Sequence, residues 1–112
     1  MKCKKIIEII EEAFPMKYAE SWDNTGFQVG DREKEVSHVF VAMDVTEETI
    51  DEAIRLGANM IVTHHPMIFS PLSAITSDTL NGRRILKMIE NGICYMSAHT
   101  NYDSCRMADL AA

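Results

Sequence analysis

Cysteine is scarce in this 112-residue chain, and the sequence has no long apolar run. The three cysteines, Cys3, Cys94 and Cys105, are odd in number and stand at unrelated spacings. They therefore lack the paired pattern of a disulfide framework or a thiolate zinc site. No stretch approaches the roughly 18 consecutive apolar residues that a membrane span needs. We therefore expect a cytoplasmic protein, in a reducing compartment and without a membrane partner.

Basic residues are also few. Eleven Lys and Arg stand against seventeen Asp and Glu, a formal net charge of −6, and no basic run offsets that balance. Because nucleic-acid binding depends on Lys and Arg that neutralise phosphates, this charge disfavours a nucleic-acid partner. The glycine-rich phosphate loops of Walker and dinucleotide-binding proteins are absent as well. The remaining composition, 46% hydrophobic and 25% charged, is typical of one globular domain over residues 1–112.

Helical periodicity marks three segments. Residues 4–14 predict an amphipathic helix that stops at Pro15, with one apolar face formed by Ile6, Ile7, Ile10 and Phe14. A second helix follows Thr46 as N-cap and ends before Gly57. A third covers about residues 78–90, with Ser77 or Asp78 as its cap and Gly92 as its terminator. We expect its inward side chains to be Ile85, Leu86 and Ile89.

Three short apolar runs, residues 39–43, 60–63 and 93–98, alternate with the second and third helices. This alternation predicts parallel strands, and the lack of strict polar alternation predicts strands covered on both faces. A loop over residues 21–31 holds a short strand at 27–29. The fold class is therefore α/β, with three layers and a mainly parallel sheet that has helices on both faces. Three parallel strands leave a sheet edge and apolar surface that need cover.

Polar side chains follow each predicted parallel strand. Asp44 follows the first strand, His64 and His65 the second, and His99 and Asp103 the third. Ligands of open α/β sheets bind beyond the carboxyl ends of the strands. Imidazole and carboxylate suit divalent transition metals. The pattern therefore predicts a metal site at this edge of the sheet, without naming a reaction.

Each of these side chains also has an ordinary structural interpretation. A lone histidine beside a strand is more often a hydrogen-bonded core residue than a ligand, which is how we interpret His38. The adjacent pair is harder to explain in that way, because burying two imidazoles without partners costs free energy twice. Asp103 could instead cap a following helix. We interpret Asp44 as a cap of the helix after the first strand.

Four motifs carry a family resemblance. They are WDNTGFQVG at residues 22–30, AMDVT at 42–46, IVTHHP at 61–66 and AHTNYD at 98–103. Together, and in this order, they resemble the Nif-three-like family, whose members are often named GTP cyclohydrolase I type two homologues. The motifs extend along most of the chain, and the last two are the most specific.

The resemblance implies a toroidal homohexamer in which each protomer has two similar α/β halves and two divalent metal ions, for which zinc, iron, manganese and nickel are candidates. It implies that His64 and His65 each bind one ion and that Asp103 is a carboxylate ligand. His99 would lie beside Asp103, either as a ligand or as a group that orients it. The remaining family ligands, a His and a Glu on one helical turn, come from the second half.

The sequence reads as a truncated N-terminal metal-binding domain, because residues 107–112 begin a helical pattern that stops without a cap. We expect weak or absent metal binding by this chain alone. In the complete site, the resemblance implies metal-dependent hydrolysis of a small anionic substrate such as a nucleotide. The family's names suggest cyclohydrolase chemistry on the guanine ring of GTP. Phosphoester hydrolysis is a rival reaction, and metal or partner binding without turnover is a rival function. No residue is assigned as catalytic.

Overall fold

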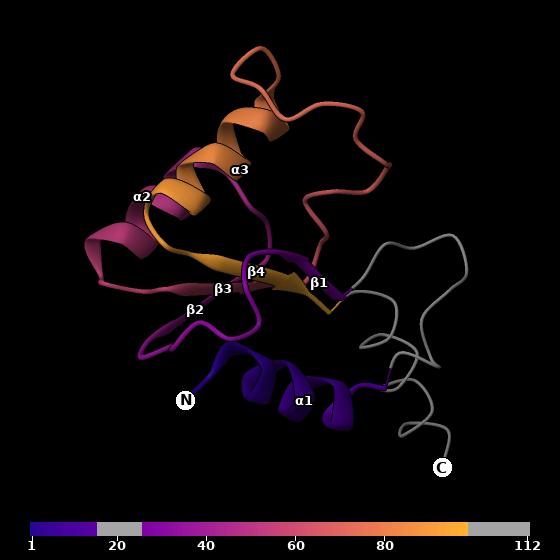
Figure 1. Ribbon diagram of the computed structural model, residues 1–112, viewed down its shortest axis with the longest axis vertical. Coiled ribbons are helices and arrows are strands. Elements are labelled where there is room, and N and C mark those ends of the chain that lie inside the picture. The colour runs from indigo at the N-terminus through magenta and orange to yellow at the C-terminus, as the bar shows by residue number, and fades with distance from the viewer. Residues whose placement is uncertain (16–25, 99–112) are drawn as a thin grey trace.

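The computed structural model describes residues 1–15 and 26–98 of the chain. Three helices and four strands are arranged in three layers, with α1 on one side of the sheet and α2 and α3 on the other (Figure 1). In chain order the elements are α1 (Cys3–Ala13), β1 (Gly26–Val29), β2 (Val39–Ala42), α2 (Glu47–Arg55), β3 (Met60–Thr63), α3 (Leu80–Glu90) and β4 (Cys94–Ser97). The three-layer α/β prediction is confirmed.

The strand order in the sheet is β1-β4-β3-β2. β2, β3 and β4 are parallel, as the sequence predicts, and Met60 of β3 lies opposite Val39 of β2 and Cys94 of β4. The short strand expected near residues 27–29 is β1, which pairs antiparallel with β4 and has an irregularity between Phe27 and Val29. β1 and β2 are therefore the two edges of the sheet.

The larger core lies between the sheet and the α2–α3 layer. It contains buried side chains from both helices and from β3 and β4, among them Ile50, Ala53, Ile61, Ile85, Met88 and Tyr95. Ile85 is inward as expected, but the prediction for Ile89 is wrong, because Ile89 is 57% exposed and Met88 is fully buried.

Both helices of this layer begin at a threonine cap. Thr46 accepts a hydrogen bond from the Thr49 amide at 3.0 Å, as predicted. Thr79 accepts one from the Gly82 amide at 3.0 Å, so the prediction of Ser77 or Asp78 as cap is wrong. The Asp78 amide instead donates to Thr76 Oγ1 in a turn that precedes the helix. This local bond delays the helix start to Leu80.

A smaller core lies between the sheet and α1. Its buried side chains are Cys3, Ile7, Val36, Met60, Cys94 and Met96. Both of its cysteines are free thiols. Burial, and next to it the neighbouring Cys94, raises the pKa of Cys3 to about 12. The Cys3 thiol is therefore a protonated apolar packing group at neutral pH.

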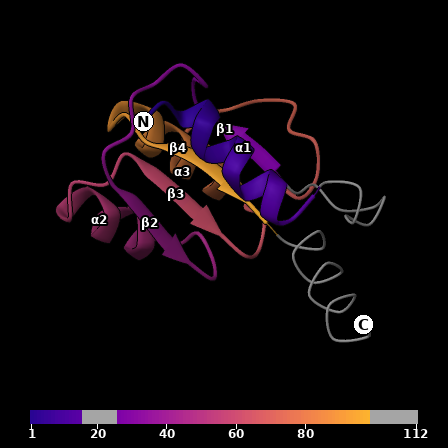
Figure 2. The ribbon, with the colours of Figure 1, turned by 90° about the horizontal axis from the view of Figure 1, so that it is seen from below.

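Among residues 1–15 and 26–98, the elements on the α1 side leave part of the sheet uncovered. Figure 2 shows α1 crossing the sheet away from β2. On β2 and just after it, Val39, Val41 and Met43 are 42%, 74% and 59% exposed. A groove of about 770 Å³ lies there, lined mainly by apolar side chains of α1, β2 and β3, and it reaches His64 and Ala98. The expectation of an uncovered edge is confirmed.

Candidate metal site

His64 and His65 lie directly beyond the carboxyl end of β3. Their backbone amides continue the pairing of β3 with β2, since His64 N donates to Ala42 O at 3.2 Å and His65 N to Met43 O at 2.9 Å. The two ring centroids are 4.9 Å apart and the rings are tilted by 50°. His64 is half-buried, whereas the His65 side chain is 47% exposed. The sheet therefore places both imidazoles at the predicted edge.

Each imidazole is held through Nδ1. His65 Nδ1 lies 2.6 Å from Asp44 Oδ1, and His64 Nδ1 lies 3.2 Å from the Ala98 carbonyl oxygen. An ionised carboxylate and a carbonyl oxygen only accept hydrogen bonds, so both rings donate from Nδ1. The lone pair of each neutral ring then lies on Nε2, which is the form of histidine that binds metals.

This geometry corrects the interpretation of Asp44. Thr46, and not Asp44, caps α2, and the Asp44 side chain orients His65. The signal was present in the sequence, because Asp44 and His65 follow adjacent parallel strands at nearly equal positions. Ala42 pairs with Thr63, so residues two beyond each strand come together at the edge. Sequence reasoning missed this contact because Asp is also common near helix starts.

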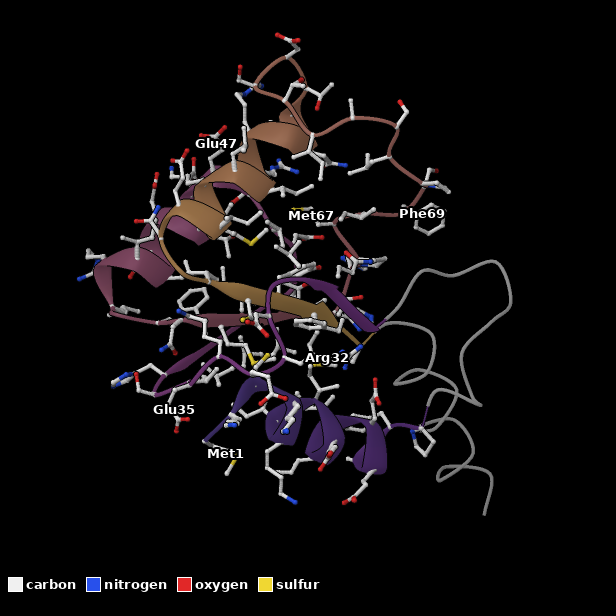
Figure 3. The ribbon with its side chains drawn as sticks, viewed as in Figure 1. Met1, Arg32, Glu35, Glu47, Met67 and Phe69 are labelled. Atoms are coloured by element: carbon white, nitrogen blue, oxygen red, sulfur yellow. The ribbon has the colours of Figure 1, made fainter. Side chains whose placement is uncertain are left out.

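The chain after the histidines is tied to two other elements by side-chain amides. Gln28 of β1 donates to the Ile68 carbonyl oxygen at 2.9 Å and accepts from the Ile68 amide at 3.0 Å. Asn81 of α3 donates to the Met67 carbonyl oxygen at 3.2 Å. Met67 is buried whereas Phe69 is half exposed, and Figure 3 places both on the irregular segment that leads towards α3. These bonds fix a segment that has neither helix nor strand.

Tyr95 and Thr63 add two buried hydroxyl groups beneath the same segment. Their oxygens are 2.6 Å apart, and Tyr95 is fully buried. Burial raises the pKa of Tyr95 above its ordinary value, so its hydroxyl stays protonated and can act as both donor and acceptor. A tyrosine inside a fully buried strand needs a partner for its hydroxyl, which is the sequence signal that could have pointed to this contact.

His38 does not lie at this edge. His38 lies at the amino end of β2, where it is exposed and contacts Ser37 Oγ at 3.0 Å. His99 and Asp103 lie outside the described residues, as do residues 22–25 of the first motif. Within residues 1–15 and 26–98, no three His, Cys, Asp or Glu side chains are grouped so as to hold a metal ion. The ligand prediction for Asp103 and His99 therefore stays a prediction.

The described chain is thus an α/β domain with a histidine pair and a supporting carboxylate at the carboxyl edge of its sheet. No helix among the described residues is long and apolar enough to cross a membrane. The family model described as Duf34/NIF3 (NGG1p interacting factor 3) matches residues 1–111. The chain belongs to the Duf34/NIF3 family.

Relatives with curated names are similar over nearly the whole chain. A GTP cyclohydrolase 1 type 2 homolog of Clostridium perfringens is 50% identical over 106 residues, which are 95% of this chain and 40% of the relative. The protein of the same name in Streptomyces coelicolor is 39% identical over 103 residues, 92% of this chain and 36% of the relative. The chain therefore spans about two fifths of the length of these relatives.

Solved structures agree with the family assignment. A Bacillus cereus protein related to NIF3 superposes with a TM-score of 0.86 at 48% identity, over 92% of this chain and 28% of that protein. Reduced HcgD from Methanocaldococcus jannaschii superposes with a TM-score of 0.84 at 38% identity, over 92% of this chain and 41% of that protein. The fold described above is the fold of the corresponding part of these proteins.

Proposed function

We propose that this chain supplies one side of a dinuclear divalent-metal site, in which His64 and His65 each bind one ion through Nε2. Asp103 is the proposed carboxylate ligand from the chain after β4, with His99 beside it. The ions are zinc, iron, manganese or nickel. The complete site belongs to the longer family protein, which we propose to be a homohexamer with the remaining ligands in its second half.

The carrying observation is the Nδ1 contact of each imidazole, above all the 2.6 Å contact between His65 and Asp44. A carboxylate or carbonyl group behind a histidine fixes its tautomer and raises the basicity of the opposite nitrogen, which is the usual support of a metal-bound histidine. Two neighbouring rings 4.9 Å apart suit two ions better than one. The residues present therefore fit a metal pair.

The proposed activity is metal-dependent hydrolysis of a nucleotide. When bound, a metal pair supplies a water of lowered pKa and a Lewis acid for the substrate. The chain's own contribution is to orient the ligands and to present neutral imidazoles, which leave net positive charge for an anionic substrate. The names of the relatives favour GTP over other nucleotides. Phosphoester hydrolysis remains a rival within the same chemistry.

A zinc titration of this chain tests the metal site. We expect weak zinc binding that is abolished by the double substitution His64→Ala and His65→Ala. His38→Ala should leave it unchanged, because His38 lies at the amino end of β2, away from the proposed site. Metal analysis of chain purified without chelator should find less than two ions per chain. Zinc binding that survives the double substitution would contradict the proposal.

Activity is best tested with the second half present. This chain can be fused to the remaining part of the Clostridium perfringens relative, whose matched segment is 50% identical. The fusion should bind two ions per chain and consume GTP, and His64→Ala should remove activity and metal together. Bound metal without turnover of GTP or a phosphoester would instead favour a metal-binding role without catalysis.

A further inference from the structure

The buried hydroxyl groups of Thr63 and Tyr95 form a clamp on the main chain around Pro66. Thr63 Oγ1 donates to the His65 carbonyl oxygen at 2.7 Å. The Tyr95 hydroxyl lies 3.1 Å from the same oxygen and accepts from the Met67 amide at 3.0 Å. The clamp therefore holds the main chain immediately before and immediately after Pro66.

Pro66 explains why a clamp is needed. Proline has no amide hydrogen, so the chain that leaves β3 cannot continue the sheet ladder at this residue. The carbonyl oxygen before it and the amide after it are polar groups near the core, and leaving either unsatisfied costs about 1–3 kcal/mol. The two hydroxyl groups satisfy both, in the place where a neighbouring strand would otherwise do so.

The clamp also acts on His65, because it fixes that residue's own carbonyl group. The imidazole of His65 reaches Asp44 across 2.6 Å, and a hydrogen bond weakens steeply when its distance or angle changes. The side chains of His65 and Asp44 are 47% and 61% exposed, so water competes for the hydrogen bond between them. The buried Thr63 and Tyr95 hydroxyl groups hold the main chain of the same residue.

From this geometry we propose that Tyr95 is a positioning residue for His65. Its phenol, together with Thr63, holds the main chain around Pro66 so that the His65 ring donates from Nδ1 to Asp44 and keeps its lone pair on Nε2. This inference rests on the proposed metal-binding role of His65, but the positioning itself is measurable without metal.

The decisive measurement is the tautomer of His65 in metal-free chain. Long-range ¹H–¹⁵N correlation spectra, recorded where the imidazole is neutral, should show mainly the Nδ1–H form. Tyr95→Phe should lower the ratio of the Nδ1–H to the Nε2–H form about fivefold, the effect of losing one ordinary hydrogen bond. The zinc affinity of the same variant should fall about tenfold, as for other groups that support a ligand.

Matched variants separate positioning from general loss of stability. Ile7→Val removes one methylene from the buried cluster on the other side of the sheet and should leave the His65 tautomer unchanged at a similar loss of stability. Thr63→Val should act like Tyr95→Phe, whereas Thr63→Ser keeps the hydroxyl and should act like the wild type. If Tyr95→Phe does not fold, the Thr63 pair tests the clamp by itself.

Three results distinguish the positioning role of Tyr95 from the proposed metal role of His65. An unchanged tautomer ratio in a folded Tyr95→Phe or Thr63→Val chain would overturn the positioning role. The same holds if Ile7→Val lowers the ratio equally. A wild-type chain in which zinc binding does not depend on His65, but whose tautomer ratio falls in Tyr95→Phe, would support the positioning role and refute the proposed metal role.

Discussion

The two faces of the sheet are covered by helices to different degrees. Two helices cover one face, and they bury side chains from β3, β4 and both helices in one cluster. One helix covers the other face, and it leaves Val39, Val41 and Met43 exposed along β2. Strands are about 4.8 Å apart and a helix with its side chains is about 10 Å wide, so one helix covers about two of four strands. The two faces therefore differ in how many helices cover them.

The helices of the two faces are also attached differently. α2 and α3 begin at threonine side-chain caps. α1 has no side-chain cap, and its first amides donate to the loop before β2, with Cys3 N on Lys34 O at 2.7 Å and Lys4 N on Arg32 O at 2.8 Å. The terminal amine of Met1 adds an ion pair with Glu35, near the labels in Figure 3. The start of α1 is thus attached to the loop before β2 by main-chain hydrogen bonds and an ion pair.

The largest expected difference between the faces comes from replacing one apolar side chain on each. Ile50→Ala on the covered face should lower the free energy of unfolding by about 2–5 kcal/mol, because Ile50 is fully buried. Val41→Thr on the open face should change it by less than about 0.5 kcal/mol, since Val41 is 74% exposed. Urea unfolding followed by circular dichroism measures both. Equal losses would mean that β2 is covered in solution.

The second prediction concerns the buried thiol of Cys3, the first residue of α1. Its pKa is raised from 9.0 to about 12 in the folded chain, so ionisation favours the unfolded state. Stability should be unaffected below about pH 9 and should fall as the pH rises from 9 towards 12. Tyr95, whose pKa is also raised, adds to the fall only at higher pH. Urea midpoints across this range should decline less in Cys3→Ala. An identical decline would show that Cys3 ionises freely.

The third prediction tests how closely the loop before α3 packs on the helix. A Cβ at Gly82 would lie 1.9 Å from the Thr76 carbonyl oxygen. Alanine would add about 1 kcal/mol of helix propensity, but moving main chain out of the way costs about 1–3 kcal/mol. Gly82→Ala should therefore destabilise the chain, whereas Glu90→Ala at the exposed end of α3 should be nearly neutral. A more stable Gly82→Ala chain would show a loosely held loop.

The smallest effects should come from the helix starts. Thr79→Ala and Thr46→Ala should each cost about 1 kcal/mol, because each removes a bond to a helix amide. Ser77→Ala, at the cap expected from the sequence, should cost less than about 0.5 kcal/mol. On the other face Lys2→Ala should cost equally little, since the Lys2 side chain makes no cap. Thermal unfolding midpoints compare the four variants. A larger loss in Ser77→Ala would contradict the assigned start of α3.

Much of the fold follows from local signals in the sequence. The periodicity of α1, the Thr46 cap and the three apolar runs placed these elements within a residue or two of their observed bounds. The start of α3 was misplaced because Ser77, Asp78 and Thr79 are all good caps. Only the competing turn at Thr76 selects Thr79. Ile89 was misplaced because the direction of a helix face depends on what packs against it.

For the candidate site, the sequence by itself determined the paired histidines and the edge at which they lie, because side chains that follow parallel strands share one end of a sheet. Only the tertiary structure decided that Asp44 serves His65 and that Tyr95 and Thr63 hold the chain around Pro66. The contact between Asp44 and His65 joins residues 21 positions apart, and the contact between Thr63 and Tyr95 joins residues 32 positions apart. Strand register sets them, and register depends on how the whole sheet packs.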